Sequence, residues 1–267
     1  MNRKLILIIS DGGGNEPLAG VHLDKDNYLS FFQSPEGGAW LDSEIIIFDD
    51  NNFSLNSLEQ LIQATNLIGQ KIEYFLIVYC GHGYTDEEGE IHFEVNEASS
   101  MALNDLRETV CGTRCLFIAD SCRTICRLNE GGILDRRMFS SECQEYPAYA
   151  ALCREKYNNF ILQTDPSETT ILLACSFDEM SRENTKGGLY SYNLILAAKN
   201  KIRKMRSSQI EDPSVTDASA IACHNAASNV VAERTHNKQH PEIYLRSRAR
   251  QQFPFVVVPT LGEQLGD

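Results

Sequence analysis

Short runs of apolar, mostly β-branched residues recur along this chain, and most of them end in glycine or polar loops. Runs of this length with turns after them predict strands buried on both faces of a sheet. The intervening segments space their apolar residues as one face of a helix does. The predicted strands are Lys4–Ser10, Glu44–Phe48, Glu73–Cys80, Arg114–Ala119, Thr169–Ser176 and a last pair at Ile243–Leu245 and Phe253–Val258. The predicted helices are Leu18–Phe32, a segment from Leu55, Met101–Val110, Pro147–Tyr157, Leu189–Met205 and Ala218–Arg234.

Strands that alternate with helices predict an α/β fold, with a mostly parallel sheet of about six strands flanked by helices on both faces. No internal repeat and no linker rich in Pro, Gly or Ser divides the 267 residues, which are enough for a sizeable core. We therefore expect one domain over 1–267, with a core of about 4–258 and an inserted linker-like segment at 123–166.

Charge and composition exclude several classes of protein. The net charge of −13 opposes a nucleic-acid binder, because such proteins neutralise phosphates with Lys and Arg. Unbroken apolar runs reach at most seven residues, whereas a membrane helix needs roughly 18, so we expect no membrane span and no secretory signal. Nine cysteines without paired C-x-x-C spacing predict reduced thiols, a cytoplasmic location and no zinc site.

Two residues with catalytic chemistry follow neighbouring predicted strands. His82 stands between Gly81 and Gly83 after the third strand, and Cys122 follows the fourth. Parallel strands bring their carboxyl ends to one edge of a sheet, where an imidazole can take the proton of a thiol nucleophile. A lone histidine or cysteine is more often structural, but the pair together indicates a Cys/His dyad.

The residues around this pair resemble metacaspases and bacterial orthocaspases. Tyr79-Cys80-Gly81-His82-Gly83 is similar to their Y-S-G-H-G motif, and Asp120-Ser121-Cys122 matches their D-S-C motif. The similarity extends over most of the chain, from about Lys4 to Val258. Further matched segments are Leu18–Asp24, Ala174–Ser176 with Glu183, Gly187–Ser191 and Gln239–Pro241.

The resemblance implies a caspase-hemoglobinase fold and a monomeric cysteine endopeptidase, serving as a regulated effector of the thiol-protease class. It implies Cys122 as nucleophile, His82 as general acid and base, and the backbone N–H groups of Gly83 and Cys122 as an oxyanion hole. Within the matched motifs it implies substrate contacts at three further positions, which are Cys80, Ser176 and Glu183. Cys80 itself replaces the serine that is usual in the family.

Specificity follows from two acidic residues. Asp120 stands two residues before Cys122, and Asp24 matches a second acidic position of the metacaspase specificity pocket. Two carboxylates in one pocket favour a cation, and a guanidinium can engage them bidentately. We therefore predict cleavage of exposed protein sites after Arg and secondarily after Lys. The alternatives are that either aspartate caps a loop or helix and that Asp26 takes the place of Asp24.

Regulation is predicted less directly. Arg136 and Arg137, in the inserted segment, are candidates for self-cleavage or simply exposed charges. The acidic stretch Asp86–Glu97 predicts a small hairpin, and its first residues lack the spacing of a calcium-binding loop, so no cofactor is expected.

Two other functions stay open. One is a catalytically silent scaffold that binds a partner. The other is a module whose nucleotide or small-molecule ligand switches the protease on, suggested by the glycine-rich Asp11–Asn15 loop. An activating ligand or a regulatory protein is therefore a predicted partner.

Overall fold

The central element is a six-stranded sheet with the strand order β11-β8-β7-β3-β1-β2. The computed structural model describes residues 1–12, 18–49, 53–96, 99–123, 147–207, 219–245 and 252–259. Five strands run parallel, and β11 pairs antiparallel with β8 at one edge. The strands are β1 (Arg3–Ser10), β2 (Ile45–Phe48), β3 (Tyr74–Gly81), β7 (Arg114–Asp120), β8 (Thr169–Leu173) and β11 (Glu242–Leu245). The predicted α/β architecture is confirmed.

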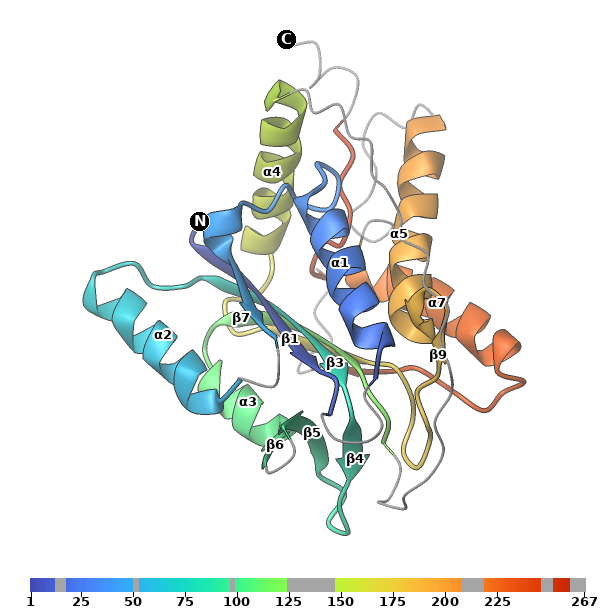
Figure 1. Cartoon of the computed structure of the whole chain (residues 1–267). Coiled ribbons are helices and arrows are strands. Elements are labelled where there is room, and N and C mark those ends of the chain that lie inside the picture. Colours follow the sequence, from blue (N-terminus) through green and yellow to red (C-terminus); the bar gives the residue numbers. More distant parts are fainter. Residues whose placement is uncertain are drawn as a thin grey trace.

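Helices cover both faces of this sheet (Figure 1). One face carries α1 (Gly20–Gln33), α4 (Pro147–Leu162), α5 (Leu189–Ser207) and α7 (Ala220–Arg234). The other carries α2 (Leu55–Leu67) and α3 (Leu103–Thr109). A short 3-10 helix, η1 (Asp42–Glu44), precedes β2. Within the described ranges, no helix has the length and hydropathy of a membrane span.

Two small sheets lie near the carboxyl ends of the parallel strands. The predicted hairpin at Asp86–Glu97 is part of an antiparallel sheet of β4 (Gly83–Thr85), β5 (Ile91–Asn96) and β6 (Ser99–Ala102). A two-stranded hairpin of β9 (Glu183–Asn184) and β10 (Gly187–Gly188) leads directly into α5. The sheet of β4, β5 and β6 begins directly after β3, and the β9–β10 hairpin begins after the loop that follows β8.

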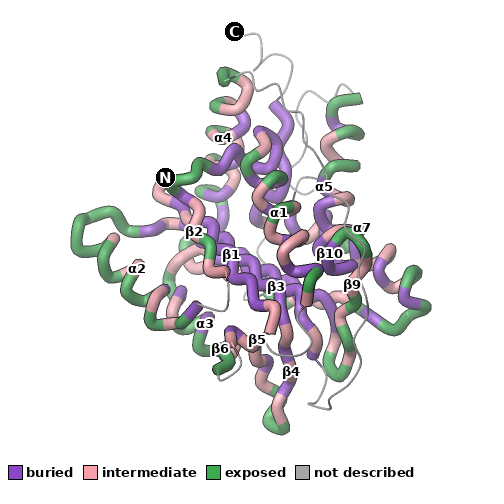
Figure 2. The backbone as a smooth tube through the Cα atoms, in the orientation of Figure 1, coloured by how far each residue is buried: buried purple, intermediate pink, exposed green. Residues whose placement is uncertain are grey.

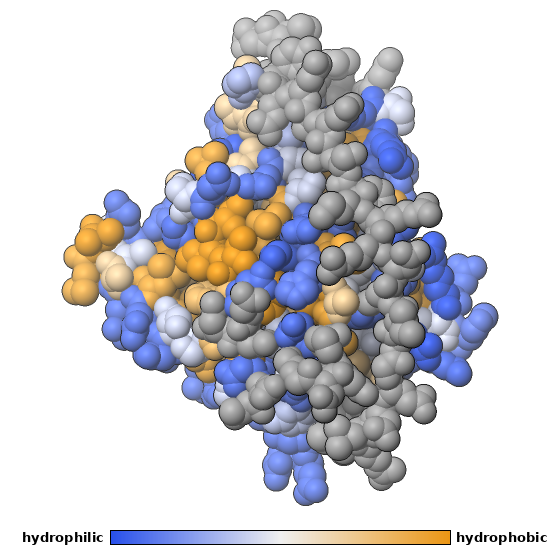
Figure 3. Space-filling model, in the orientation of Figure 1, coloured by the Kyte–Doolittle hydropathy of each residue, from blue (hydrophilic) through white to orange (hydrophobic). Residues whose placement is uncertain are grey.

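The central strands are buried from both sides (Figure 2), which explains their continuous apolar sequences. All residues of β3 are buried, and alternate side chains enter two hydrophobic clusters. The edge strand β2 is less protected, and Figure 3 shows apolar side chains gathered over this sheet edge between α1 and α2. Ile47 of β2 is 42% exposed.

The predicted last strand at Phe253–Val258 was wrong. This segment is buried but makes only an isolated bridge, between Pro254 and Ser219. The Phe255 ring lies 5.1 Å from that of Phe31 in α1, so the segment packs into the helical layer. The sheet edge beside β8 is already occupied by β11.

A buried cluster of charges joins β1 to the helical layer. The Arg3 side chain is fully buried, donates to Gly38 O at 2.7 Å and lies 4.1 Å from the centre of the Trp40 ring. Arg3 and Arg154 both donate to the Glu44 carboxylate. Burial alone would raise the pKa of Glu44, but these two guanidinium groups hold that pKa below its usual value. The Glu44 carboxylate therefore compensates one of the two positive charges and holds both guanidinium groups in place.

Candidate active site

His82 and Cys122 lie at the same edge of the sheet. In the parallel pairing of β3 with β7, Cys80 is in register with Asp120. His82 and Cys122 each lie two residues beyond this pair, and both are partly exposed. The carboxyl ends of these neighbouring strands therefore bring the two predicted catalytic residues to one site.

The loop that carries His82 is held by its neighbours. The Tyr79 hydroxyl donates to the carbonyl oxygens of His82 at 2.5 Å and of Glu94 at 2.7 Å. Gly12 packs against the imidazole with a φ of 86°, and a Cβ at this position would overlap the ring carbon Cδ2. Because β-carbon-bearing residues rarely adopt this φ, both conformation and space require glycine here.

Cys122 is held by the loop that follows β8. Its Sγ donates to Ser181 O at 3.6 Å. The next residue, Arg123, donates its N–H to Glu179 O at 2.9 Å and accepts from Asp178 N–H at 3.1 Å. The buried Arg123 guanidinium also pairs with Glu242 on β11. The backbone around the thiol is thus fixed between the two loops.

The thiol of Cys122 is in a negative environment. Burial raises its pKa, the hydrogen bond with Ser181 lowers it, and the charges of Asp120 and Glu183 raise it further. The thiol is therefore protonated at neutral pH, and a base is needed to make it a nucleophile.

The His82 and Cys122 loops also touch directly. A Cβ on Gly83 would lie 2.9 Å from both Cys122 O and Ser121 Oγ. No side chain fits between the two backbones at this point, so glycine allows their close approach.

Three carboxylates gather beside Cys122. Asp24 of α1 is 2% exposed and Asp120 of β7 is 7% exposed. Both oxygens of Asp24 accept from Gly188 N–H, at 3.0 and 2.9 Å. Asp120 accepts from Ser191 N–H at 2.9 Å and from the Ser181 hydroxyl. The third carboxylate belongs to Glu183, and a Cβ on Gly20 would lie 2.7 Å from its Cδ.

These carboxylates repel one another. Burial raises the pKa of Asp24, and the charges of Asp120 and Glu183 add to this rise. Burial raises the pKa of Asp120 despite its hydrogen bonds from Ser181 and Ser191. Burial and the charge of Asp120 also raise the pKa of Glu183. A cation placed among the three would relieve this repulsion. We call Asp24, Asp120 and Glu183 the acidic cluster.

The geometry of Asp24 and Asp120 also fits the alternative that they act as helix caps. Gly188 and Ser191, whose N–H groups they accept, stand at the amino-terminal end of α5, where such groups lack helical partners. A carboxylate offers about four acceptor positions, so this capping leaves room for a cation. Asp26 is exposed, and Asp24 is the one that joins the cluster.

The remaining predicted residues have different surroundings. Cys80 is fully buried, and burial together with the Asp24 charge raises its pKa. Ser176 lies in the loop after β8, where its hydroxyl donates to His240 O at 2.9 Å. Arg136 and Arg137 lie outside the described residues, as does most of the glycine-rich loop.

The acidic stretch at 86–90 closes its own hairpin. Asp86 accepts from Glu90 N–H at 2.8 Å, and its second oxygen lies 2.8 Å from His92 Nε2. Within the described ranges, no group of three or more His, Cys, Asp or Glu side chains is arranged to hold a metal ion.

Two residues that organise the site carry no local signal of that role in the sequence. Ser181 links Cys122 to Asp120, and buried Gln239 donates to Ala174 O at 2.9 Å while accepting from Arg182 N–H at 3.2 Å. Gln239 is fully buried, so it supports the loop after β8 from the protein interior. Gln239 begins the matched segment Gln239–Pro241, but nothing local in the sequence indicates which loop it would support.

Comparison with known proteins assigns the chain to a family. A family model described as the caspase domain matches residues 3–253, which is most of the chain. The chain belongs to the caspase-domain family. It is thus a cysteine protease domain of caspase type, with protein substrates as its class of substrate.

Solved structures support the fold of this caspase domain. Caspase-1 from Spodoptera frugiperda is 15% identical, with a TM-score of 0.55 over 97% of this chain and 91% of the other. The structure of pro-sf-caspase-1 is 15% identical, with a TM-score of 0.50 over 95% of this chain and 90% of the other. No curated protein sequence gave a significant match.

Proposed function

We propose that this caspase domain is an endopeptidase that cleaves proteins after Arg, and secondarily after Lys, with a Cys122/His82 dyad. The observation that carries the proposal is the acidic cluster beside Cys122, in which all three carboxylates have raised pKa values. A guanidinium among them would form charge-assisted hydrogen bonds and favour their ionised forms. An acidic side chain would be repelled there.

The chemistry proceeds through an acyl-enzyme. His82 takes the proton of the Cys122 thiol as sulfur attacks the carbonyl carbon of the basic residue. The N–H groups of Gly83 and Cys122 donate to the oxyanion that forms. His82 then gives its proton to the leaving amine, and the C–N bond breaks to leave a thioester. Water, deprotonated by His82, hydrolyses the thioester and returns the thiol.

A basic substrate would also help to activate the nucleophile. The charges of Asp120 and Glu183 raise the pKa of Cys122 in the free site. A bound guanidinium offsets those charges, so transfer of the thiol proton to His82 becomes easier when the correct substrate is present. Specificity and activation then have the same electrostatic origin.

The test is hydrolysis of fluorogenic peptides that differ only in their last residue, Arg, Lys, Asp or Ala. Wild type and Cys122→Ala are compared with and without calcium. We expect wild type to cleave after Arg faster than after Lys and not to cleave after Asp. We expect Cys122→Ala to cleave none of the peptides. Cleavage after Asp would refute the role of the acidic cluster. Arg cleavage that persists in Cys122→Ala would refute the nucleophile.

A silent scaffold is the main alternative. Its biological effect would persist in Cys122→Ala, whereas an effector protease would lose it.

Self-cleavage after Arg136 or Arg137 would release fragments of defined mass from wild type and none from Cys122→Ala. Monomeric state, cytoplasmic location and an activating ligand stay predictions from the sequence.

A further inference from the structure

A cavity of about 390 Å³ lies between α5 and α7, and no residue of the candidate active site lines it. Its apolar lining comes from Leu196 and Ala197 of α5 and from Ala226 and Val230 of α7. Ala226 is exposed and the other three are half-buried. A partner that covered them would remove apolar surface from water, which favours binding. We call this cavity the α5–α7 groove.

Three cations line the groove as well, which are Lys201 and Lys204 of α5 and Arg234 of α7. The whole of α5 contains five Lys or Arg residues and no Asp or Glu, although the chain has a net charge of −13. Outside the groove, Arg206 pairs with Glu36. Within the described ranges the three lining cations form no ion pair, so the groove offers them to an anionic partner.

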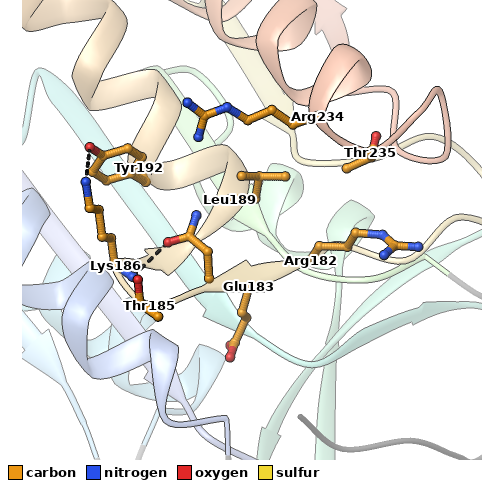
Figure 4. Close-up of a pocket in the computed structure, with 9 residues that line it drawn as sticks. Arg182, Glu183, Thr185, Lys186, Leu189, Tyr192, Arg234 and Thr235 are labelled. Atoms are coloured by element: carbon orange, nitrogen blue, oxygen red, sulfur yellow. Dashed lines mark hydrogen bonds between the residues drawn. The ribbon is translucent and has the colours of Figure 1, made fainter. Parts of the chain in front are cut away.

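The cations stand at the two ends of the groove. Arg234 ends α7 and also lines a cavity beside the β9–β10 hairpin, together with Leu189 and Tyr192 of the first turn of α5. Figure 4 shows the Arg234 guanidinium on the side of Leu189 and Tyr192. Lys201 and Lys204 lie farther along α5, 9 and 12 residues after Tyr192. At 1.5 Å per residue, this places them roughly 14 to 18 Å from the Arg234 end.

A helix is the occupant that matches this spacing. Side chains at positions i, i+4, i+7 and i+11 lie on one face of a helix, and 11 residues span roughly 16 Å. Carboxylates at the first and last of these positions would meet cations at both ends of the groove. Apolar side chains at the two positions between them would contact the apolar lining. Amphipathic helices bind to grooves on other proteins in this way.

We propose that the α5–α7 groove is a docking site for an acidic amphipathic helix of a partner protein. The helix carries carboxylates about three turns apart, with apolar side chains between them on the same face. Charge complementarity supports this occupant, because none of the described residues that line the groove is acidic. A regulatory protein would bind here without occupying the active site, so the proposal does not depend on cleavage specificity.

The test measures binding of three fluorescent peptides of about 16 residues to the full chain by fluorescence anisotropy. All three consist of Ala and Gln with Leu at i+4 and i+7, and they contain no Arg or Lys for the proposed protease to cleave. The acidic-stripe peptide has Glu at i and i+11. The second peptide has its two Glu residues at i+2 and i+9, on the opposite face, and the third has Gln in place of Glu. We expect the acidic-stripe peptide to bind at least about 5-fold more tightly than either control.

Two adjacent residues of α5 provide a matched pair of variants. Lys204 lines the groove, whereas Arg203 is exposed beside it and does not. Lys204→Glu should weaken binding of the acidic-stripe peptide about 5-fold or more. Arg203→Glu makes the same change of charge and should stay within about 2-fold at physiological salt, where charges are screened beyond about 8 Å. Thermal melting confirms that both variants are folded.

Ala226→Arg separates docking in the groove from attraction by charge alone. The substitution adds a cation but fills part of the groove with a long side chain. Docking of a helix predicts weaker binding of the acidic-stripe peptide, whereas attraction by charge alone predicts tighter binding. Tighter binding by this variant would therefore refute the proposal.

Other outcomes would also overturn it. Equal binding of the three peptides would exclude recognition of one helix face, and an equal loss in Lys204→Glu and Arg203→Glu would exclude the groove. A wild-type dimer that Lys204→Glu dissociates, without a preference for the acidic-stripe peptide, would assign the groove to a second copy of the chain. Binding to vesicles that contain phosphatidylserine, with no peptide binding, would assign it to a membrane surface.

Discussion

Replacement of Asp120 by Asn should change substrate binding and thiol reactivity in opposite directions. The amide keeps the size of the carboxylate and can still accept from Ser191 N–H, so the cap on α5 is retained. What is lost is one charged partner of the substrate guanidinium. A hydrogen bond to a charged group is worth about 1.5 to 3 kcal/mol, so kcat/KM for Arg peptides should fall roughly 10- to 150-fold.

The same substitution removes a charge that raises the pKa of Cys122. A neutral alkylating reagent such as iodoacetamide should therefore modify Cys122 of Asp120→Asn faster than Cys122 of wild type at pH 7, because the thiolate fraction is larger. Rates are followed by mass spectrometry, and thermal melting confirms that the fold is kept. If alkylation slows, or if Arg cleavage is unchanged while Cys122 reacts faster, the electrostatic account of the site is wrong.

Three further perturbations test other parts of the structure. Gly12→Ala should displace the His82 imidazole and lower kcat at least 10-fold with little change in KM, measured by steady-state kinetics; unchanged kcat would show that the contact does not position the ring. Glu44→Gln leaves the buried Arg3 poorly compensated and should lower the free energy of unfolding by about 3 kcal/mol in a denaturant titration; a loss below about 1 kcal/mol would contradict this. Burial lowers the pKa of His224 to about 4 in the folded protein. In the unfolded state the pKa is near 6.5, so the unfolded state binds the proton first as the pH falls. The free energy of unfolding therefore decreases between about pH 6.5 and about pH 4. The stability of wild type relative to His224→Gln should therefore shrink over this interval, and a gap independent of pH would refute the assignment.

The sequence predicted the parallel sheet and the dyad because both depend on local signals. A buried strand has a continuous apolar run, and a strand that is followed by His82 or Cys122 delivers that residue to one edge. Phe253–Val258 has the same apolar signal, but burial does not distinguish a strand from an extended segment packed on helices. Its environment depends on β11, which occupies the free edge beside β8.

Helical spacing in the sequence distinguishes Asp24 from Asp26. Asp24 lies three residues after Val21 and four before Tyr28, both buried on the same face of α1, whereas Asp26 falls on the exposed face.

We propose Cys122 as the nucleophile of a site that selects a cation. It is tested most directly with a pair of peptidyl acyloxymethyl ketones, identical except for Arg or Asp at the residue that carries the reactive group, followed by peptide mapping of all nine cysteines. We expect a single adduct on Cys122 with the Arg reagent and none with the Asp reagent. An Arg adduct on another cysteine, or equal labelling of Cys122 by both reagents, would contradict it.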